Sequence, residues 1–290
     1  MVSRVAFEVA GTFLVLFTLR EVFRDIFHPT LSGNLSDALG DGLSLLLRHT
    51  RLRQAAGPLV LIAVLLSWIV LLCLGFAIIY YGLYPQDFTT TAGVESMSVG
   101  SRMVHCLYFS AGALCTFQTF DLNPKTDWLR LIVALQGLVG ISMITASVSW
   151  LVLLYPALAR VRATARWLSI AAEAEERSGL SVQEHDASFL SLLEQRLIQA
   201  RLDLVLFPIL LHFYALTPGY TLAFALPTAC RYAREGMAVG QTVRTRLAAT
   251  KVLIALEDLA RTVGERLMDA DIFQTPDVGA VFEAYADRER

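Results

Sequence analysis

The sequence predicts an all-α membrane protein with three transmembrane helices, one shorter re-entrant helix and a helical C-terminal domain. Three observations predict this class. Hydrophobic residues make up 55% of the 290 residues and charged residues only 17%, which is too apolar for an ordinary soluble protein. Two runs, Leu59–Tyr84 and Leu131–Ala159, hold no Asp, Glu, Lys or Arg over 26 and 29 residues. Between them lie a shorter apolar segment and a polar return.

The two uncharged runs are long enough to cross a membrane. As helices they would measure roughly 39 and 44 Å at about 1.5 Å per residue, against a hydrocarbon core of roughly 30 Å. A core helix of a soluble protein rarely stays uncharged for so long, because one of its faces meets water. Both runs are therefore predicted to be transmembrane helices.

A third span is predicted at the N-terminus, over about Ser3–Phe27. Glu8 lies within reach of one membrane interface, and Arg20 and Arg24 extend toward the other. A signal peptide is the rival interpretation, but charges follow the apolar core directly and no small-residue cleavage pattern does. Pro29 ends the helix, because proline disfavours helical backbone at the residue before it.

The distribution of basic residues predicts the orientation in the cell (inner) membrane. Arginines are concentrated in the connector 28–54 and just after Ala159, whereas acidic residues outnumber basic ones in 85–127. The positive-inside rule therefore places 28–54 and the C-terminal region in the cytoplasm. It places 85–127 and the N-terminus outside.

The chain accordingly divides into three parts. Residues 1–54 hold the N-terminal span and its connector, 55–158 hold the two long spans with their loop, and 159–290 form a cytoplasmic helical domain. In that domain one helix is expected over about 157–178, ended near Gly179, and a second over about 184–214 with a kink at Pro208. Thr217-Pro218 is expected to open a third, and Gly240 to interrupt the chain before a fourth over about 241–270. A short, polar, acidic tail is expected after Asp271.

One stretch of this domain, Leu204–Leu226, is apolar enough to suggest a membrane hairpin. Pro208, Pro218 and Pro227 interrupt it, and each removes a helical hydrogen bond. A buried helical hairpin is therefore favoured over a further span.

The loop between the long spans has the form of a pore loop. Arg102–Cys115 is predicted to form a short helix that enters the membrane, and Thr116–Asp121 a strand that returns. Such a backbone survives at that depth only beside protein or a water-filled cavity, where its oxygens replace the water around a cation. One copy supplies one wall, so a closed pore requires several copies, and four is the known solution for this architecture.

The segment from Leu59 to Leu158 resembles the pore module of potassium channels, with an outer helix, a pore helix, a filter and an inner helix. The family's filter reads Thr-Val-Gly-Tyr-Gly-Asp, and this chain has, without a gap, Thr116, Phe117, Gln118, Thr119, Phe120 and Asp121. Tyr108-Phe109-Ser110 corresponds to the family's Tyr-Phe-Ser, and Gly140 to its inner-helix hinge glycine. Asp25–Pro29 and Thr145–Trp150 are similar to a bacterial subgroup with an added N-terminal helix and a helical cytoplasmic domain.

The filter departs from the family at both glycines. A non-glycine residue with positive φ costs about 1–2 kcal/mol, and Gln118 and Phe120 stand where the family's backbone needs glycine. Thr119 replaces the bracing Tyr, so the resemblance carries over only Thr116, as an inner hydroxyl ring, and Asp121, as a carboxylate ring at the outer mouth. Weak or altered potassium selectivity is therefore expected.

Alternatives stay open for single filter residues. Gln118 either offers amide oxygens to an ion or braces the loop. Phe117 and Phe120 either pack against protein or form a hydrophobic constriction, and Asp121 either attracts cations or caps the loop.

Three hydroxyl residues share one face of the last span, because Ser142, Thr145 and Ser149 recur at steps of three and four. They either line a wet inner cavity with Gly140 or let helices pack closely. Gly140 itself either permits bending or admits a close neighbour. Gln136 is costly in lipid, so it is expected to face protein or the cavity.

The sequence thus predicts a homotetrameric channel for passive conduction of a monovalent cation, K⁺ or Na⁺. No cofactor, bound metal or nucleic acid is expected, and the partners are further copies of the chain and membrane lipid. No believable catalytic set of side chains occurs, so an enzyme is not predicted. The alternative is a non-conducting, channel-like scaffold or sensor; a coupled transporter is disfavoured by the single loop and the lack of an inverted repeat.

Overall fold

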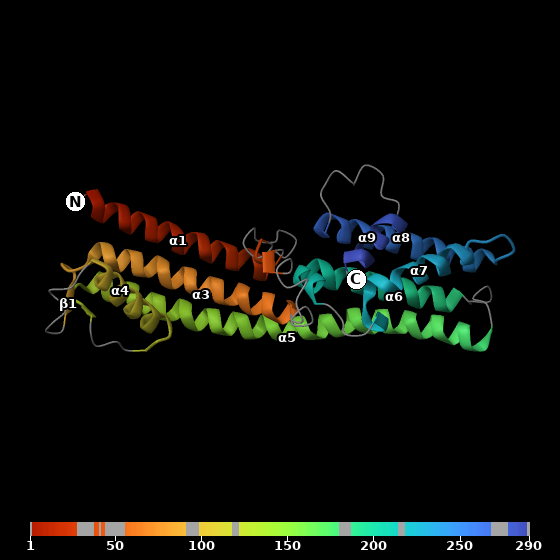
Figure 1. Cartoon of the computed structure of the whole chain (residues 1–290), viewed down its shortest axis with the longest axis horizontal. Coiled ribbons are helices and arrows are strands. Elements are labelled where there is room, and N and C mark those ends of the chain that lie inside the picture. The colour runs from red at the N-terminus through yellow and green to blue at the C-terminus, as the bar shows by residue number, and fades with distance from the viewer. Residues whose placement is uncertain are drawn as a thin grey trace. The chain divides into compact units, whose positions relative to one another are not determined.

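A computed structural model describes residues 2–27, 38–40, 42–43, 56–90, 99–117, 122–179, 187–213, 218–267 and 278–288 (Figure 1). The regular elements among these residues are helices and one small two-stranded sheet. The chain forms two compact units. Unit 1 comprises Met1–Asp41 and Leu61–Val152, and unit 2 comprises Gly42–Val60 and Leu153–Arg290.

Two described helices, α3 (Ala56–Leu83) and α5 (Asp127–Ser178), are long and apolar enough to cross a membrane. They contain the two uncharged runs from which spans were predicted, except for Tyr84, which lies just after α3. The 52-residue α5 continues through Pro156, so the last predicted span and the helix expected over 157–178 form one element. It ends at Ser178, and the next residue, Gly179, has a φ of 65°, which favours glycine.

Helix α1 (Val2–Phe27) agrees with the predicted N-terminal helix, although it is not among the helices that pass the length and hydropathy test for a span. It packs against α3 in unit 1, side by side in Figure 1. A Cβ atom on Gly11 would lie 2.6 Å from the carbonyl oxygen of Gly75, so only glycine allows this approach of the two backbones.

A polar contact fixes the N-terminal turn of α1. The Arg4 guanidinium donates hydrogen bonds to Glu8 (2.9 Å) one turn later, to Gln86 (2.7 Å) and to Asp87 (2.5 Å). Gln86 and Asp87 lie in the turn after α3, so this contact joins the N-terminal turn of α1 to the C-terminal end of α3.

A short helix and the small sheet complete unit 1. Helix α4 (Val99–Leu114) agrees with the short helix predicted over Arg102–Cys115. Strand β1 (Phe88–Thr90) pairs antiparallel with β2 (Leu122–Pro124), with Phe88 opposite Pro124. The sheet therefore joins the segment after α3 to the segment that leads into α5.

Unit 2 is built around α6 (Ala187–Leu206) and α8 (Val243–Leu267), with α7 (Leu222–Gly236) and α9 (Val278–Arg288) packed on α8. The core side chains of α6 and α8 recur at helical spacing: Leu190, Leu193, Leu197, Val252, Leu256, Leu259 and Val263. Gly240 separates α7 from α8 with φ 104°, as its predicted role as a break requires.

Two predictions for this unit were wrong. The helix expected over 184–214 ends at Leu206, and Pro208–His212 forms the 3₁₀ turn η4, because proline opposes the α conformation of the residue before it. The polar tail expected after Asp271 contains α9. Its few apolar residues share one face and are buried: Val281, Phe282, Tyr285 and Ala286.

The apolar stretch Leu204–Leu226 does not form one spanning helix. It comprises the end of α6, the 3₁₀ turns η4 and η5 (Pro218–Tyr220) and the start of α7. Leu210, Leu211 and Leu226 are buried. This part of the chain agrees with a buried hairpin, although residues 214–217, and with them the predicted cap Thr217, lie outside the described residues.

An ion pair inside unit 2 ties α5 to α6. Asp203 is buried and accepts two hydrogen bonds from Arg160, from Nε at 2.9 Å and from Nη2 at 2.6 Å. Gln199 donates a third at 3.3 Å. The two parallel bonds fix the orientation of the guanidinium as well as its distance.

Asp203→Ala is expected to lower the free energy of unfolding by about 1–2 kcal/mol, because a charge-assisted bidentate pair is lost while the half-exposed Arg160 regains water. Thermal unfolding of the purified protein measures the change. The matched control is Glu176→Ala on α5, where the carboxylate is exposed and a change below about 0.5 kcal/mol is expected. Equal effects of the two substitutions would contradict this assignment.

Candidate functional site

A buried polar network connects α3, α4 and α5 in unit 1. The Tyr80 hydroxyl donates to Gln136 Oε1 at 2.6 Å, and Gln136 Nε2 donates to the carbonyl and hydroxyl oxygens of Ser110, each at 2.9 Å. Ser110 in turn donates to the carbonyl of Cys73 at 2.8 Å. Tyr80, Ser110 and Gln136 are completely buried. Both amide protons of Gln136 and both hydroxyl protons are thereby used, which is the condition for burying such groups without penalty.

An aromatic cluster surrounds the Tyr80 end of this network. The rings of Tyr80, Phe88 and Phe109 meet edge to face, with centroids 5.1 to 5.8 Å apart. Phe88 belongs to β1 and Phe109 to α4, so the cluster fixes the sheet and the short helix to α3. Edge-to-face pairs of this kind add about 0.5–1.5 kcal/mol each beyond the area that they bury.

Glycines let α4 approach α5 closely. A Cβ atom on Gly140 would lie 1.8 Å from the carbonyl oxygen of Leu114, whereas a Cβ on Gly137 would lie 3.4 Å from that of Ala113. Of the two roles considered for Gly140, the structure therefore supports close approach by a neighbour. The end of α4 rests directly on the backbone of α5 at this glycine.

The C-terminus of α4 closes in a Schellman motif. Phe117 N–H donates to the carbonyl of Gly112 at 2.6 Å, and Thr116 N–H donates to that of Ala113 at 3.1 Å. Thr116 takes the left-handed position of the motif, with φ 59°. Its hydroxyl donates to the carbonyl of Cys115 at 2.6 Å.

This geometry corrects one expectation, that extended backbone begins at Thr116. A β-branched residue is strongly disfavoured in the left-handed region, so the surrounding contacts must hold Thr116 there. The cap also uses the carbonyls of Gly112, Ala113 and Cys115, which the helix would otherwise direct toward an ion.

The residues predicted to form the filter are only partly described. Thr116 is described at the helix cap, and Phe117 is 74% exposed in the single chain. Gln118, Thr119, Phe120 and Asp121 lie outside the described residues, and the alternatives given for them stay predictions. In the described part of the chain no group of three or more His, Cys, Asp or Glu side chains converges as metal ligands would.

The predicted cavity face of α5 is exposed in the single chain. Ser142, Thr145 and Ser149 each donate a hydrogen bond to the carbonyl four residues earlier, at 2.8, 3.0 and 2.9 Å. Their hydroxyl donors are satisfied within α5, and their oxygens still have room to accept a bond. This geometry suits a face against water or against another helix.

These three residues belong to a longer exposed pattern on α5. It repeats at alternating steps of four and three, as in a heptad seam: Leu131, Leu135, Leu138, Ser142, Thr145, Ser149 and Val152. In the most apolar 18-residue stretch of α5 only 17% is buried within the chain, whereas the corresponding share for α3 is 44%. Most of the apolar surface of this helix thus has no cover among the described residues.

Sequence reasoning found one member of the polar network and missed the others. Gln136 was expected to face protein because an amide is costly in lipid, and the structure agrees. Tyr80 was not recognised as a partner of Gln136, and Ser110 was singled out only through the Tyr-Phe-Ser match. A buried polar residue in an apolar run signals that a partner exists, but the partner's identity depends on how three helices align.

The described residues are mostly helical, two of the helices are long and apolar enough to span a membrane, and much of their apolar surface is uncovered. These features define an all-α membrane protein. The chain is 30% identical over 118 residues to the uncharacterized membrane protein YdjJ of Bacillus subtilis strain 168, a match that covers 41% of this chain and 33% of that protein. The chain thus spans about a third of the length of this relative. No family model and no solved structure matches it.

Proposed function

We propose that four copies of this chain form a cation channel of the potassium-channel type in the cell membrane, with weak or altered potassium selectivity. In this arrangement α1, α3 and the first part of α5 span the bilayer, α4 is the re-entrant pore helix, and Thr116–Asp121 line the passage. The N-terminus lies outside, and the connector 28–54 and residues 159–290 lie in the cytoplasm. The conducted ion is monovalent, K⁺ or Na⁺, and no catalytic step is involved.

The position of α4 against α5 carries the proposal. With 16 residues α4 measures about 24 Å, too short for a hydrocarbon core of roughly 30 Å. Its last residue, Leu114, lies against Gly140, which follows the start of α5 at Asp127 by 13 residues, or about 20 Å. A short helix that ends at this depth beside a spanning helix supports re-entry.

The chain then has to return within a few residues. Five residue steps separate Phe117 from Leu122, and an extended chain covers at most about 3.3–3.6 Å per step. A fully extended segment from Phe117 to Leu122 therefore covers roughly 17 Å. This length is close to the distance of about 20 Å along α5 between Asp127 and Gly140, where α4 ends. The proposal therefore requires residues 118–121 to run along the pore axis, where Gln118 and Asp121 would offer oxygen atoms to a cation.

The exposed seam of α5 supports assembly. Its outer part is apolar (Leu131, Leu135 and Leu138) and its inner part carries the hydroxyls of Ser142, Thr145 and Ser149. Turned toward a fourfold axis, the hydroxyl part would line a wet cavity on the cytoplasmic side of the filter. On α1, Val9, Phe13 and Leu16 are exposed and would face lipid, which supports the third span.

Reversal potentials test the proposal in reconstituted bilayers. Between asymmetric KCl and NaCl the protein is expected to pass current with little preference for potassium, because Gln118 and Phe120 oppose the usual carbonyl ladder. The double variant Gln118→Gly/Phe120→Gly is expected to shift the reversal potential toward that of potassium. Ser101→Ala, on α4 far from the filter, is the control and should change neither current nor selectivity. Strong potassium preference of the unmodified chain would refute the expected selectivity.

One observation favours the alternative, a non-conducting channel-like scaffold or sensor. The cap at Thr116 engages the hydroxyl and the helix carbonyls that a filter would otherwise present. Under this alternative, reconstituted tetramers carry no current at any voltage, pH or lipid composition. Monomeric purified protein would contradict the tetramer itself.

A further inference from the structure

A small cavity in unit 2 lies between the first turns of α6 and the first half of α8, with a volume of about 300 Å³. Two serines from α6 and two basic residues from α8 contribute its polar groups: Ser188, Ser191, Arg244 and Lys251. Ala187, Leu247 and Ala248 complete the wall. The volume is at the lower end of the range for pockets that hold small ligands, roughly 300–1,000 Å³.

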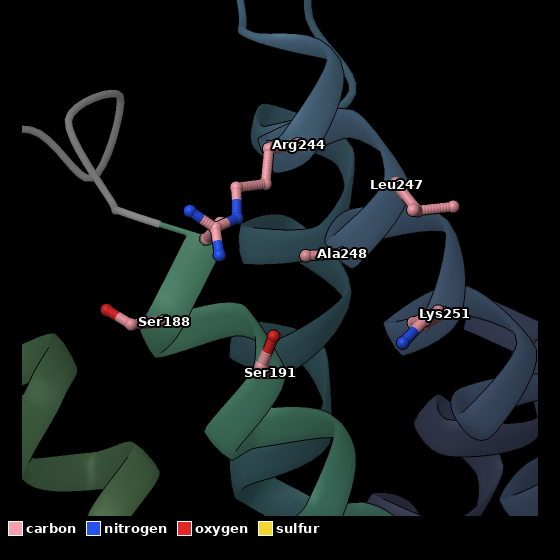
Figure 2. Close-up of a pocket in the computed structure, with 7 residues that line it drawn as sticks. Ser188, Ser191, Arg244, Leu247, Ala248 and Lys251 are labelled. Atoms are coloured by element: carbon pink, nitrogen blue, oxygen red, sulfur yellow. The ribbon is translucent and has the colours of Figure 1, made fainter.

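Arg244 is the central group of this cavity. Its guanidinium reaches from α8 across to α6, and the Ser191 hydroxyl points to the same side of the cavity (Figure 2). In the part of the chain that the structure describes, no carboxylate pairs with Arg244, whereas the other basic residue, Lys251, lies 3.8 Å from Glu194. The planar guanidinium of Arg244, with the Ser191 hydroxyl on the same side of the cavity, matches the oxygen atoms of a phosphoryl group.

The charges around the cavity agree with an anionic ligand. From Gly236 to Leu256 the sequence holds Arg244, Arg246 and Lys251 and no acidic residue. Glu194 is the acid that faces Lys251 from α6, and at 3.8 Å this contact is long enough for the amine to turn toward a ligand. The apolar wall beside these cations suits a compact organic group attached to the phosphate.

We propose that this cavity binds the phosphoryl group of a small soluble phosphate ester, held by Arg244 and Lys251 with a hydrogen bond from Ser191. The ester's organic part lies against Leu247 and Ala248. The ligand joins α6 to α8 and so stabilises unit 2. This site is independent of ion conduction, and its test needs no current.

Calorimetric titration of the full-length protein in detergent, at fixed ionic strength, tests the site with two probes, inorganic phosphate and phenyl phosphate. Saturable binding is expected for both, tighter for phenyl phosphate because of the apolar wall. Arg244→Gln is expected to weaken binding at least about tenfold, and Arg244→Lys less, since it keeps the charge but loses the fork. The matched control is Arg246→Gln on the same helix, outside the cavity, which should bind as the unmodified chain does.

Melting temperatures without ligand show whether each variant folds. Arg244 is exposed and pairs with no carboxylate among the described residues, so its replacement is expected to leave stability unchanged. If Arg244→Gln does not fold, Ser191→Val provides the same test from α6. Three outcomes would overturn the proposal: no saturable heat with either phosphate, equal weakening by Arg246→Gln, or binding only in nanodiscs that contain phosphatidylglycerol. The last outcome would assign the phosphate to a lipid headgroup.

Discussion

Gly140→Ala is expected to destabilise unit 1 by at least about 3 kcal/mol, at or beyond the upper end of the usual cost of overpacking. The added methyl group would lie 1.8 Å from the carbonyl oxygen of Leu114 and 2.8 Å from its carbonyl carbon. Both are backbone atoms, so no side-chain rotation relieves the overlap. The helices α4 and α5 have to separate, and the polar network between them has to lengthen.

This effect is measured by heating the protein in detergent and using size-exclusion chromatography to monitor how much of it stays folded at each temperature. Gly137→Ala is a matched control three residues away on the same helix, where the new Cβ would lie 3.4 Å from the carbonyl of Ala113 and 3.6 Å from Thr116 Cγ2. That is ordinary contact, and alanine favours helix over glycine by about 1 kcal/mol. The control should therefore be neutral or stabilising. Equal melting temperatures for the two variants would show that α4 does not rest on α5 at Gly140.

Gln136→Leu is expected to cost about 3 kcal/mol of stability. It removes three hydrogen bonds and leaves the Tyr80 hydroxyl buried with its proton unpaired. Leucine has a similar size and is favourable in a membrane helix, so the loss reports the polar contacts rather than the volume. The same unfolding measurement applies.

A double-mutant cycle separates the Tyr80–Gln136 bond from general effects. Tyr80→Phe alone leaves Gln136 Oε1 without its donor, whereas the double variant Tyr80→Phe/Gln136→Leu leaves neither group orphaned at that bond. The double variant should therefore lose less than the sum of the single variants, by at least about 1 kcal/mol. Strict additivity would contradict the bond. Ser142→Ala, whose hydroxyl is exposed and bonded within α5, is the control and should change stability by less than about 0.5 kcal/mol.

The long helices could be predicted from the sequence because a single property, the lack of charge over 26 and 29 residues, determines them. The helix end at Gly179 and the break at Gly240 could also be predicted from the sequence, because glycine is the residue that most easily adopts positive φ, and both have it. Helix α9 was not predicted, because its four buried apolar residues alternate with polar and charged ones. Their burial depends on the packing of α9 against α7 and α8, which the local sequence does not reveal. The end of α6 at Leu206 follows from Pro208, where only a kink within a longer helix was predicted.

Much less of the candidate site could be predicted. The short helix α4 and the burial of Gln136 followed from the sequence, whereas the left-handed Thr116 did not, because local preference opposes that conformation and only tertiary contacts stabilise it. Whether Gly140 bends or admits a neighbour depends on the position of Leu114, which no spacing rule supplies. The chemistry of Gln118 and Phe120 stays a prediction that the electrical measurements address.

The meeting of Gly11 with Gly75 restricts how this protein can drift in sequence. When a large residue intrudes on a contact, evolution ordinarily repairs the damage by shrinking the residue opposite. At Gly11 this repair fails, because an added Cβ would lie 2.6 Å from the carbonyl oxygen of Gly75 and 2.9 Å from the backbone nitrogen of Ile79, and neither backbone atom can be made smaller. A larger residue at Gly11 can therefore be accommodated only by moving one helix away from the other, whereas a larger residue at Gly75 first meets the side chain of Val15, which a smaller residue can replace.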